Sequence, residues 1–441
     1  MNESYPSEQA IGIEYYVSET TGVGGRMRAQ PDDFAVTEIE KFDTEPAGAD
    51  AGAYPYLIIR AQLYNRETNE FVQALSSRLG ISRKRIDWAG TKDKRAVSTQ
   101  LFSIKGIDPE AITEVELGRS VEIDIVGRAG RALEFGDLAG NQFTITVSDP
   151  ERPENAKEIT DELETFGDET VGVPNYFGQQ RFGSMRPITH EVGLSILRGD
   201  WEDAVRTYVA EPAETEPEKT QQIRQTAGSH LAASELQQAL DVLPNRLDYE
   251  RTLVHALIEG KSHKEAIETL PWNLQRLFVH AVQSYIFNQI LSRRLEEGIS
   301  FVEPVPGDVV CFADRSAPEG VVIPDMDRTQ TVSEARVETV SRHCKRQRAF
   351  ITAPLVGTET DLGSGKIGEI ERDVLEAFDI DTRSFALPDD WASEGTRRAI
   401  FLPVEPEITQ DPLQFSFALP KGSYATVVMR EYLKTPPVEL G

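Results

Sequence analysis

The segment Ala89-Gly90-Thr91-Lys92-Asp93-Lys94-Arg95 places one aspartate among three cations. Small residues at its start let the backbone turn tightly, and the neighbouring cations should favour the ionised form of the Asp93 carboxyl. An ionised carboxylate can act as a nucleophile or as a base. The alternative is an ordinary turn aspartate that caps the next element. Composition alone favours neither interpretation.

The chain is acidic, with 73 Asp and Glu against 46 Lys and Arg and a net charge of −27. A protein that binds nucleic acid usually carries a basic surface instead. At about 1 M salt the Debye length is near 3 Å, so we expect a protein adapted to high salt, whose surface carboxylates serve solubility. The charge is also uneven: residues 78–105 hold eight basic and two acidic residues, and residues 342–348 carry +4. The alternative for each basic cluster is an ordinary solvated face.

The length of 441 residues, with 39% hydrophobic residues, suits two domains. There is no run of about 18 apolar residues and no signal peptide, so we expect a soluble, cytoplasmic protein without membrane contact. Cys311 and Cys344 lack CxxC spacing, and the six histidines lack metal-ligand spacing, which predicts free thiols and no metal site. Residues 363–368 satisfy GxGxxG without a strand directly before them, which predicts a turn.

Two periodicities divide the chain. Alternating residues predict strands near 33–39, 54–63, 100–104, 142–147, 401–404 and 414–419. Helical spacing of apolar residues predicts helices near 68–79, 201–208, 234–240, 251–258, 271–298 and 424–433. Order is expected to begin near Gly25, and residues 213–222 are expected to form an exposed excursion. The simplest architecture is a helix-rich domain inserted into a sheet-rich domain that both ends of the chain build.

Five blocks in order along the chain resemble the TruD family of tRNA pseudouridine synthases. The blocks are residues 28–38, 90–96, 140–143, 175–183 and 419–431. The resemblance therefore covers nearly the whole chain. It implies an α/β (α+β) pseudouridine synthase fold, with a mixed, largely antiparallel sheet flanked by helices. The catalytic domain would comprise residues 1–183 and 396–441, and an inserted α/β TRUD domain would comprise residues 184–395.

The resemblance also implies the reaction, which converts a uridine of tRNA, uridine 13 in the family, to pseudouridine without metal or organic cofactor. Asp93 would be the catalytic aspartate. The residues leave open whether it attacks the sugar carbon or acts through proton removal from the sugar, a glycal-type route. The target base would be flipped out of the RNA. The tRNA would lie in a cleft between the two domains, with residues 78–105 on its floor.

Three further residues would contact the flipped nucleotide by the same resemblance. Phe143 would offer a stacking face. Asn141, two residues away on the same side of a strand, would bind a polar edge of the base or brace the aspartate loop. Tyr424 stands where bacterial relatives often carry Phe and would pack against the nucleotide. Apart from the family, Phe143 and Asn141 would be an ordinary core phenylalanine and a turn asparagine.

Three basic residues would complete the site. Arg430 is a candidate counter-ion for Asp93, although its six-residue separation from Tyr424 does not suit one helical face. Lys92 could serve as that counter-ion or could bind phosphate. Arg181 would contact RNA or fix the junction between the domains.

Two other classes of protein compete with this interpretation. A non-catalytic RNA-binding or chaperone protein could keep the fold, but Asp93 in its complete motif argues against it. A nucleosidase or glycoside hydrolase would also use carboxylates. Such enzymes commonly need a carboxylate pair, and no second acidic residue stands out in these motifs.

Overall fold

The computed structural model describes residues 2–92, 94–183, 185–388 and 391–440, so the predicted catalytic residue Asp93 lies outside the described residues. The chain divides into two compact units. Unit 1 contains Met1–Tyr16, Pro174–Phe312 and Met326–Phe401, and unit 2 contains Val17–Val173, Ala313–Asp325 and Leu402–Gly441. Residues 1–16 and 174–183, predicted to belong to the catalytic domain, group with the helices of unit 1. The predicted domain limits at 183/184 and 395/396 stay a prediction.

The main element of unit 2 is an eight-stranded sheet. In spatial order its strands are β15 (Glu407–Gln410), β16 (Leu413–Pro420), β8 (Leu138–Thr146), β3 (Phe34–Glu40), β6 (Val97–Lys105), β4 (Tyr56–Tyr64) and β7 (Val121–Ala129), with β5 (Ile86–Trp88) paired to β6. Within the described part of the chain, β3 and β6 pair in parallel and the other neighbours pair antiparallel. The predicted mixed, largely antiparallel sheet is confirmed.

Strand β3 shows why the sequence pattern was readable. Phe34, Val36 and Glu38 are buried at alternate positions, as period-two spacing predicts. Val36 lies opposite Phe143 of β8, which in turn lies opposite Phe417 of β16. Directly opposed residues of antiparallel strands share one face of the sheet. The pairing therefore gathers residues from three distant segments on one face.

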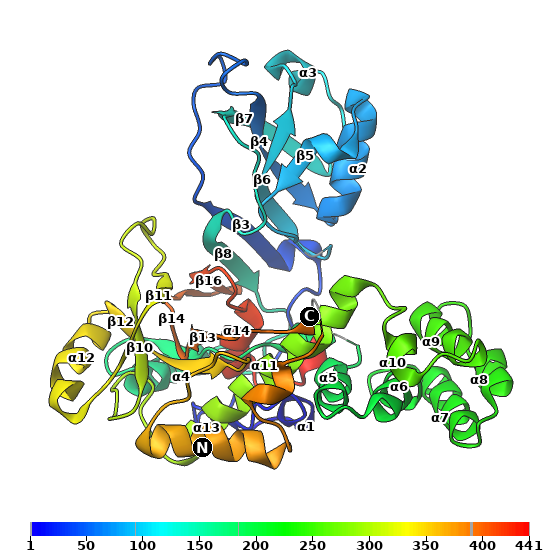
Figure 1. Cartoon of the computed structure of the whole chain (residues 1–441). Coiled ribbons are helices and arrows are strands. Elements are labelled where there is room, and N and C mark those ends of the chain that lie inside the picture. The colour runs from blue at the N-terminus through cyan, green and yellow to red at the C-terminus, as the bar shows by residue number, and fades with distance from the viewer. Residues whose placement is uncertain (1, 93, 184, 389–390, 441) are drawn as a thin grey trace. The chain divides into compact units, whose positions relative to one another are not determined.

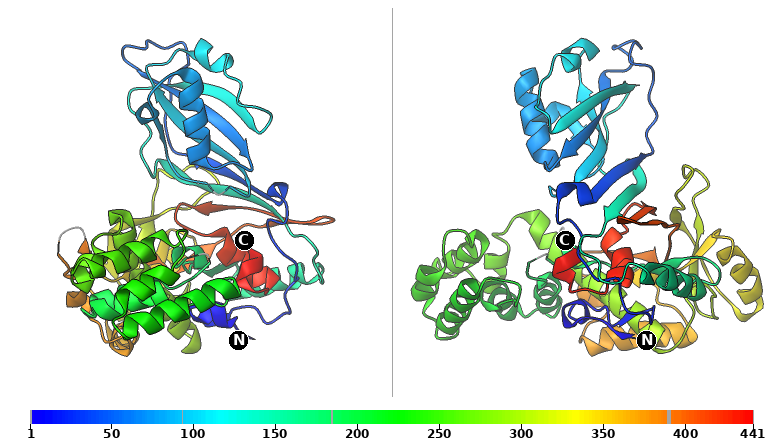
Figure 2. Two further views of the ribbon diagram at one scale, coloured as in Figure 1. Left: turned by 90° about the vertical axis from the view of Figure 1, so that its right-hand side faces the viewer. Right: turned by 180° about the vertical axis from the view of Figure 1, so that it is seen from behind.

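Helix α2 (Thr68–Leu79) covers part of this sheet. Its buried residues Phe71, Val72 and Leu75 follow helical spacing, and Gly80 ends it with a φ of 64°, a conformation that glycine adopts without strain. The ring of Phe71 lies 4.7 Å from that of Phe102 in β6. Figures 1 and 2 show α2 running along the strands of unit 2. The predicted helix is confirmed.

Shorter elements complete unit 2. They are η1 (Pro31–Asp33), η2 (Arg83–Arg85), α3 (Pro109–Thr113), α4 (Asn155–Phe166), β9 (Gly172–Pro174), β14 (Phe401–Pro403), α14 (Ala425–Leu433) and η7 (Pro437–Leu440). Tyr432 of α14 packs its ring 4.7 Å from Phe415 of β16, and its hydroxyl lies 3.0 Å from the Thr160 hydroxyl of α4. The predicted closing helix is thus present and is fixed to the sheet and to α4.

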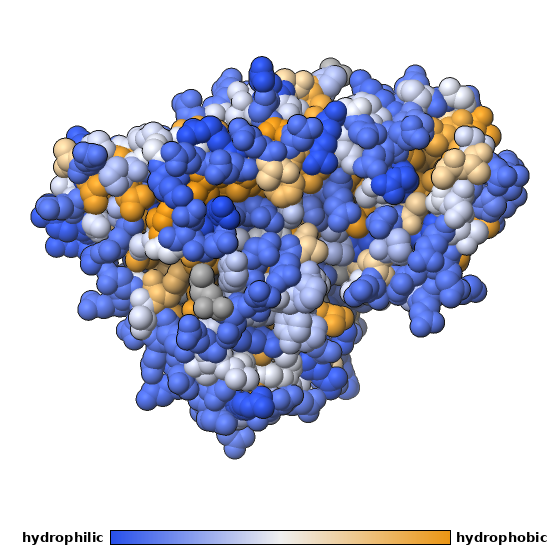
Figure 3. Space-filling model, turned by 90° about the horizontal axis from the view of Figure 1, so that it is seen from below, coloured by the Kyte–Doolittle hydropathy of each residue, from blue (hydrophilic) through white to orange (hydrophobic). Residues whose placement is uncertain are grey.

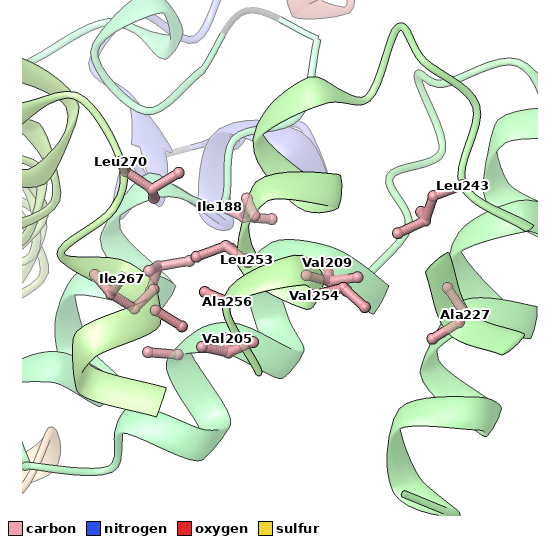
Figure 4. Packing of buried hydrophobic residues seen from close by; sticks show 14 of the residues in the cluster. Ile188, Val205, Val209, Ala227, Leu243, Leu253, Val254, Ala256, Ile267 and Leu270 are labelled. Atoms are coloured by element: carbon pink, nitrogen blue, oxygen red, sulfur yellow. The ribbon is translucent and has the colours of Figure 1, made fainter. Parts of the chain in front are cut away.

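Unit 1 is mainly helical (Figure 1). Its helices are α1 (Pro6–Gln9), α5 (Thr189–Leu197), α6 (Trp201–Ala210), α7 (Glu218–Ala232), α8 (Leu236–Val242), α9 (Asp248–Ile258), α10 (His263–Ile267), α11 (Trp272–Glu296), α12 (Val337–Cys344) and α13 (Gly365–Ala377). Figure 4 shows apolar side chains such as Val205, Leu253 and Ile267 turned toward one another in the core of the α5–α10 bundle. Among the described residues no helix is long and apolar enough to cross a membrane.

The predicted excursion at 213–222 is wrong in its second half, because α7 begins at Glu218. The buried face of α7 contains Arg224, which bonds to Glu216 and Glu250, rather than a continuous apolar stripe. A helix held by buried ion pairs gives little apolar periodicity for sequence analysis to detect.

The remaining elements of unit 1 include the four strands of a sheet with the order β11-β10-β12-β13. They are β1 (Asn2–Glu3), β2 (Tyr15–Tyr16), η3 (Gln179–Arg181), β10 (Val309–Ala313), β11 (Pro324–Thr331), η4 (Glu334–Arg336), β12 (Ala349–Leu355), η5 (Thr382–Phe385) and β13 (Thr396–Ala399). The turn predicted at residues 363–368 is wrong from Gly365 on, because α13 begins at Gly365. Strand β12 ends at Leu355, so no strand leads directly into these glycines.

The expectation that order begins near Gly25 is wrong. Asn288 of α11 is fully buried; its Nδ2 donates to the backbone oxygens of Ile11 at 2.9 Å and Phe177 at 3.0 Å, and its Oδ1 accepts from the Phe177 N–H at 2.8 Å. One amide thus ties the N-terminal segment and the block at 175–183 to α11. Sequence patterns miss such order because the partners are distant in the chain.

Replacing Asn288 by alanine should destabilise unit 1 by roughly 3 kcal/mol, since three buried backbone groups lose their partner. Urea unfolding in high salt would measure the loss. Gln237→Ala, on the exposed side of α8, is the matched control and should change stability by less than about 0.5 kcal/mol. Equal midpoints for the two variants would refute the clamp.

The net charge predicts a dependence on salt. Hydrophilic residues predominate on the face shown in Figure 3, and a net charge of −27 disfavours the compact state through self-repulsion when screening is weak. The thermal midpoint should therefore fall when KCl is lowered from about 2 M to about 0.1 M. A midpoint that rises on desalting would contradict adaptation to high salt.

Candidate active site

The motif loop, residues 89–96, connects β5 to β6 in unit 2. Its first and last residues are fixed by backbone hydrogen bonds: Gly136 N–H donates to the Ala89 oxygen at 2.7 Å, and Asn65 N–H donates to the Ala96 oxygen at 2.9 Å. Asp93 itself lies outside the described residues, and its role stays a prediction. The structure does show how the residues around it are held.

Lys92 is held by a buried ion pair. Its Nζ lies 2.8 Å from Oε1 of Glu38, and the two side chains are 9% and 2% exposed. The Lys92 backbone N–H donates to the Thr68 hydroxyl at 3.1 Å, and Glu38 Oε2 accepts from the Leu101 N–H at 3.3 Å. The ammonium is thus directed at Glu38 beneath the loop. Its described partner is a carboxylate of the sheet, which argues against the open alternative that Lys92 binds phosphate.

The electrostatics of the pair follow from its burial. Burial raises the pKa of the Glu38 carboxyl, and the attraction and hydrogen bond of Lys92 act against that rise. A carboxylate so deeply buried is tolerated when it is paired.

Asn141 and Glu38 share a face of the sheet, since Asn141 lies opposite Glu38 on one side and Leu419 on the other. The Oδ1 of Asn141 is buried and has no hydrogen-bond partner among the described residues, and the same holds for Nε2 of Gln100. Leaving a buried polar atom unpaired costs about 1 to 3 kcal/mol. Such atoms on one face are consistent with a site for a polar ligand.

Phe143 lies two positions from Asn141 on the same face. Its ring is only 7% exposed and packs 5.8 Å from both Phe34 and Phe417. The Phe34 ring is itself covered by the Arg28 guanidinium, which lies 3.9 Å from the centre of that ring. Phe143 is therefore part of an aromatic cluster and presents little free surface. Its predicted role as the stacking face stays a prediction.

The C-terminal candidates flank helix α14. Tyr424 is the half-buried residue just before the helix, and Arg430 lies within it, 2% exposed. Arg430 bonds to Glu431, whose second oxygen accepts from Val17 N–H at 3.1 Å and from the Ser18 hydroxyl at 3.2 Å. The structure thus anchors Arg430 in the core of unit 2. Its pairing with Asp93 is untested.

Arg181 belongs to unit 1. Its Nε donates to the Ser284 hydroxyl of α11 at 3.1 Å, and its guanidinium lies 5.7 Å from the Phe177 ring centre. In the same region His190 is 2% exposed, and burial lowers its pKa to about 4, so it is neutral at pH 7. The block at 175–183 is thus a packing element of unit 1 in the described structure.

The basic segment 78–105 is less free than its composition suggests. Lys92 pairs with Glu38, Lys94 with Glu70, and Arg85 bonds to backbone oxygens of Lys105 and Gly106. Five cations of the segment are exposed without an ion pair to any described residue: Arg78, Arg83, Lys84, Arg95 and Lys105. These remain available to phosphates.

Sequence reasoning missed the role of Glu38. Its signal was present, because a glutamate occupies an inward position of the Phe34-Val36-Glu38 alternation, where an apolar residue is expected. A charged residue at such a position calls for a buried partner. The described residues contain no cluster of three or more His, Cys, Asp or Glu that could hold a metal ion.

Comparison with known proteins identifies the family. The model of the family described as "tRNA pseudouridine synthase D (TruD)" matches residues 10–432. The chain is 52% identical to relatives of that name from Halobacterium salinarum, over the full length of both chains, and 52% identical to one from Natronomonas pharaonis, again over both full lengths. The crystal structure of a relative from Methanosarcina mazei matches with a TM-score of 0.86 at 39% identity, covering 99% of this chain and all of that one. The chain therefore belongs to the TruD family of tRNA pseudouridine synthases.

Proposed function

We propose that this protein converts uridine 13 of tRNA to pseudouridine, with Asp93 as the catalytic carboxylate and with the target base flipped out of the RNA. Family membership supports the reaction class. The observation that carries the assignment of the site is the position of the motif loop, which the Lys92–Glu38 pair holds over the sheet face that also bears Asn141. The acidic composition fits the relatives from halophilic archaea.

The reaction breaks the bond between N1 of uracil and C1′ of the ribose and forms a bond from C5 to C1′. The C5 proton is lost and N1 gains one, so the change is an isomerisation that needs no redox partner. Asp93 can start it in either of two ways, by attack on C1′ or by removal of a sugar proton, and both need the ionised carboxylate. The loop sets where that carboxylate stands.

Asn141 has the chemistry to hold the base. Its Oδ1 is a hydrogen-bond acceptor with no partner among the described residues, and the N3–H of uracil is a donor. Pairing the two removes the cost of the buried oxygen. This supports recognition of the polar edge over the alternative role of bracing the loop. Phe143 and Tyr424 would contact the faces of the nucleotide.

A direct assay separates this proposal from the other classes. Unmodified tRNA transcript is incubated with the protein in high salt, and pseudouridine is then mapped along the RNA. Pseudouridine at position 13 supports the proposal. Free uracil would indicate a hydrolase, and unchanged uridine would indicate a binding protein without catalysis. Pseudouridine at another position would show that the target is not uridine 13 but would leave the proposed reaction in place.

Asp93→Asn should abolish turnover, because the amide can neither attack C1′ nor remove a proton, while tRNA affinity stays within about threefold. Asp87→Asn is the matched control on the preceding strand β5, where the carboxyl is half-buried, and it should stay active. Single-turnover pseudouridine formation and filter binding give the two readouts. Retained activity in Asp93→Asn would exclude the assigned role.

Glu38→Gln should lower the single-turnover rate about 10- to 100-fold with little change in tRNA affinity, because the unpaired Lys92 ammonium shifts the loop. Glu40→Gln on the same strand is the control, since Glu40 pairs with Arg60 at a partly exposed site, and it should react normally. Adding Lys92→Met to Glu38→Gln should restore stability without restoring the rate. A normal rate in folded Glu38→Gln would show that the pair does not position the loop.

A further inference from the structure

Phe135 is an exposed aromatic residue that the site described above does not use. Its side chain is 79% exposed, the highest value among the exposed large hydrophobic side chains of the described residues, ahead of Val438 at 65%. It lies in the β7–β8 turn, residues 130–137. A single exposed apolar residue is common on protein surfaces and needs no explanation by itself. What surrounds Phe135 makes it unusual.

The β7–β8 turn is held rigidly. The N–H of the buried Leu133 donates to the Ser103 hydroxyl at 3.0 Å, and the Glu134 N–H donates to Asp137 Oδ2 at 2.8 Å. Arg131 forms an ion pair with Asp137 and stacks 4.6 Å from the Phe42 ring centre. The turn is therefore fixed on both sides of Phe135. A backbone fixed in this way loses little conformational entropy when a ligand covers the side chain that it carries.

The same turn is bonded to the motif loop. Gly136, the residue after Phe135, donates its N–H to the Ala89 oxygen at 2.7 Å, and its own oxygen accepts from Lys421 Nζ at 3.1 Å. Gly136 has a φ of 101°, a conformation that favours glycine. Phe135 is thus set directly beside the start of the loop that carries Asp93, next to an exposed lysine of the segment before Tyr424.

The charges of the turn favour a base over a phosphate as the partner of Phe135. Within residues 130–137, Arg131 is offset by Glu134 and Asp137, which leaves −1. The turn therefore presents an aromatic ring and no net positive charge, while Lys421 supplies a cation nearby. Aromatic side chains stack on unpaired bases of RNA, and cations contact the backbone.

We propose that Phe135 stacks on a base of tRNA that directly flanks the target uridine. The inference rests on the proposed function, because it takes the RNA at this loop to be the substrate. Flipping a nucleotide leaves its neighbours without a stacking partner. The ring of Phe135 provides one, on a backbone that the Gly136 to Ala89 hydrogen bond ties to the loop.

The test compares Phe135→Ala with Phe135→Tyr, and Tyr249→Ala in α9 serves as a control for loss of an exposed aromatic residue elsewhere. Affinity is measured by filter binding of unmodified tRNA transcript to proteins that also carry Asp93→Asn, so that no turnover occurs. Phe135→Ala should weaken binding between about fivefold and about a hundredfold. Phe135→Tyr and Tyr249→Ala should bind normally. Circular dichroism checks that each variant folds.

The partner base is identified with two transcripts, each abasic at one nucleotide flanking the target uridine. On one of them the effect of Phe135→Ala should fall below about twofold, because the base that stacks is already missing. An unchanged effect on both, or normal binding of intact tRNA by Phe135→Ala, would overturn the stacking. Failure of the proposed function would be seen in a different experiment, because the wild-type protein would then form no pseudouridine in the mapping assay.

Discussion

The ion pair between Lys92 and Glu38 is the interaction on which the candidate site depends. It places a full positive charge, 9% exposed, immediately before the residue that the family motif makes catalytic. A lysine at such depth is stable only with its partner, and so the pair fixes which way the loop leaves the sheet. Thr68 and Leu101 add hydrogen bonds to the two partners. The loop is therefore positioned by contacts that its own residue Lys92 makes with the sheet.

The register of three strands brings the family motifs together. Strands β3 and β8 come from the first part of unit 2 and β16 from its last part, and pairing sets Glu38, Asn141 and Leu419 in one row. Gly140 allows the close approach at the end of this row, since a Cβ there would lie 2.2 Å from the Leu419 oxygen. A slip of one residue would turn each side chain to the other face. The site therefore depends on register as much as on residue identity.

The sequence predicted the elements whose signal is local. The alternation in β3, the apolar spacing of α2 and the final helix were all readable, because burial of one face follows period two or 3.6. The Lys92–Glu38 contact spans 54 residues, and the hydrogen bond from Asn288 of α11 to Ile11 spans 277. A local sequence pattern cannot indicate a contact between residues so far apart in the chain, and these contacts are known only from the structure. The role of Asp93 rests on the family motif alone.

The unpaired polar atoms beneath the motif loop point to selection for function over stability. Asn141 Oδ1, Gln100 Nε2 and the Ser98 hydroxyl are buried on this sheet face without partners among the described residues, and each such atom costs about 1 to 3 kcal/mol. Apolar side chains of similar size would remove that cost, as they do at Val36 and Leu419 on the same face. Polar side chains stand at Asn141 and Gln100 instead, which fits a surface whose unpaired atoms bond to a polar ligand when it binds. The ion pair holds the loop over this surface, so the proposed site joins a fixed loop to polar atoms that a nucleobase would pair.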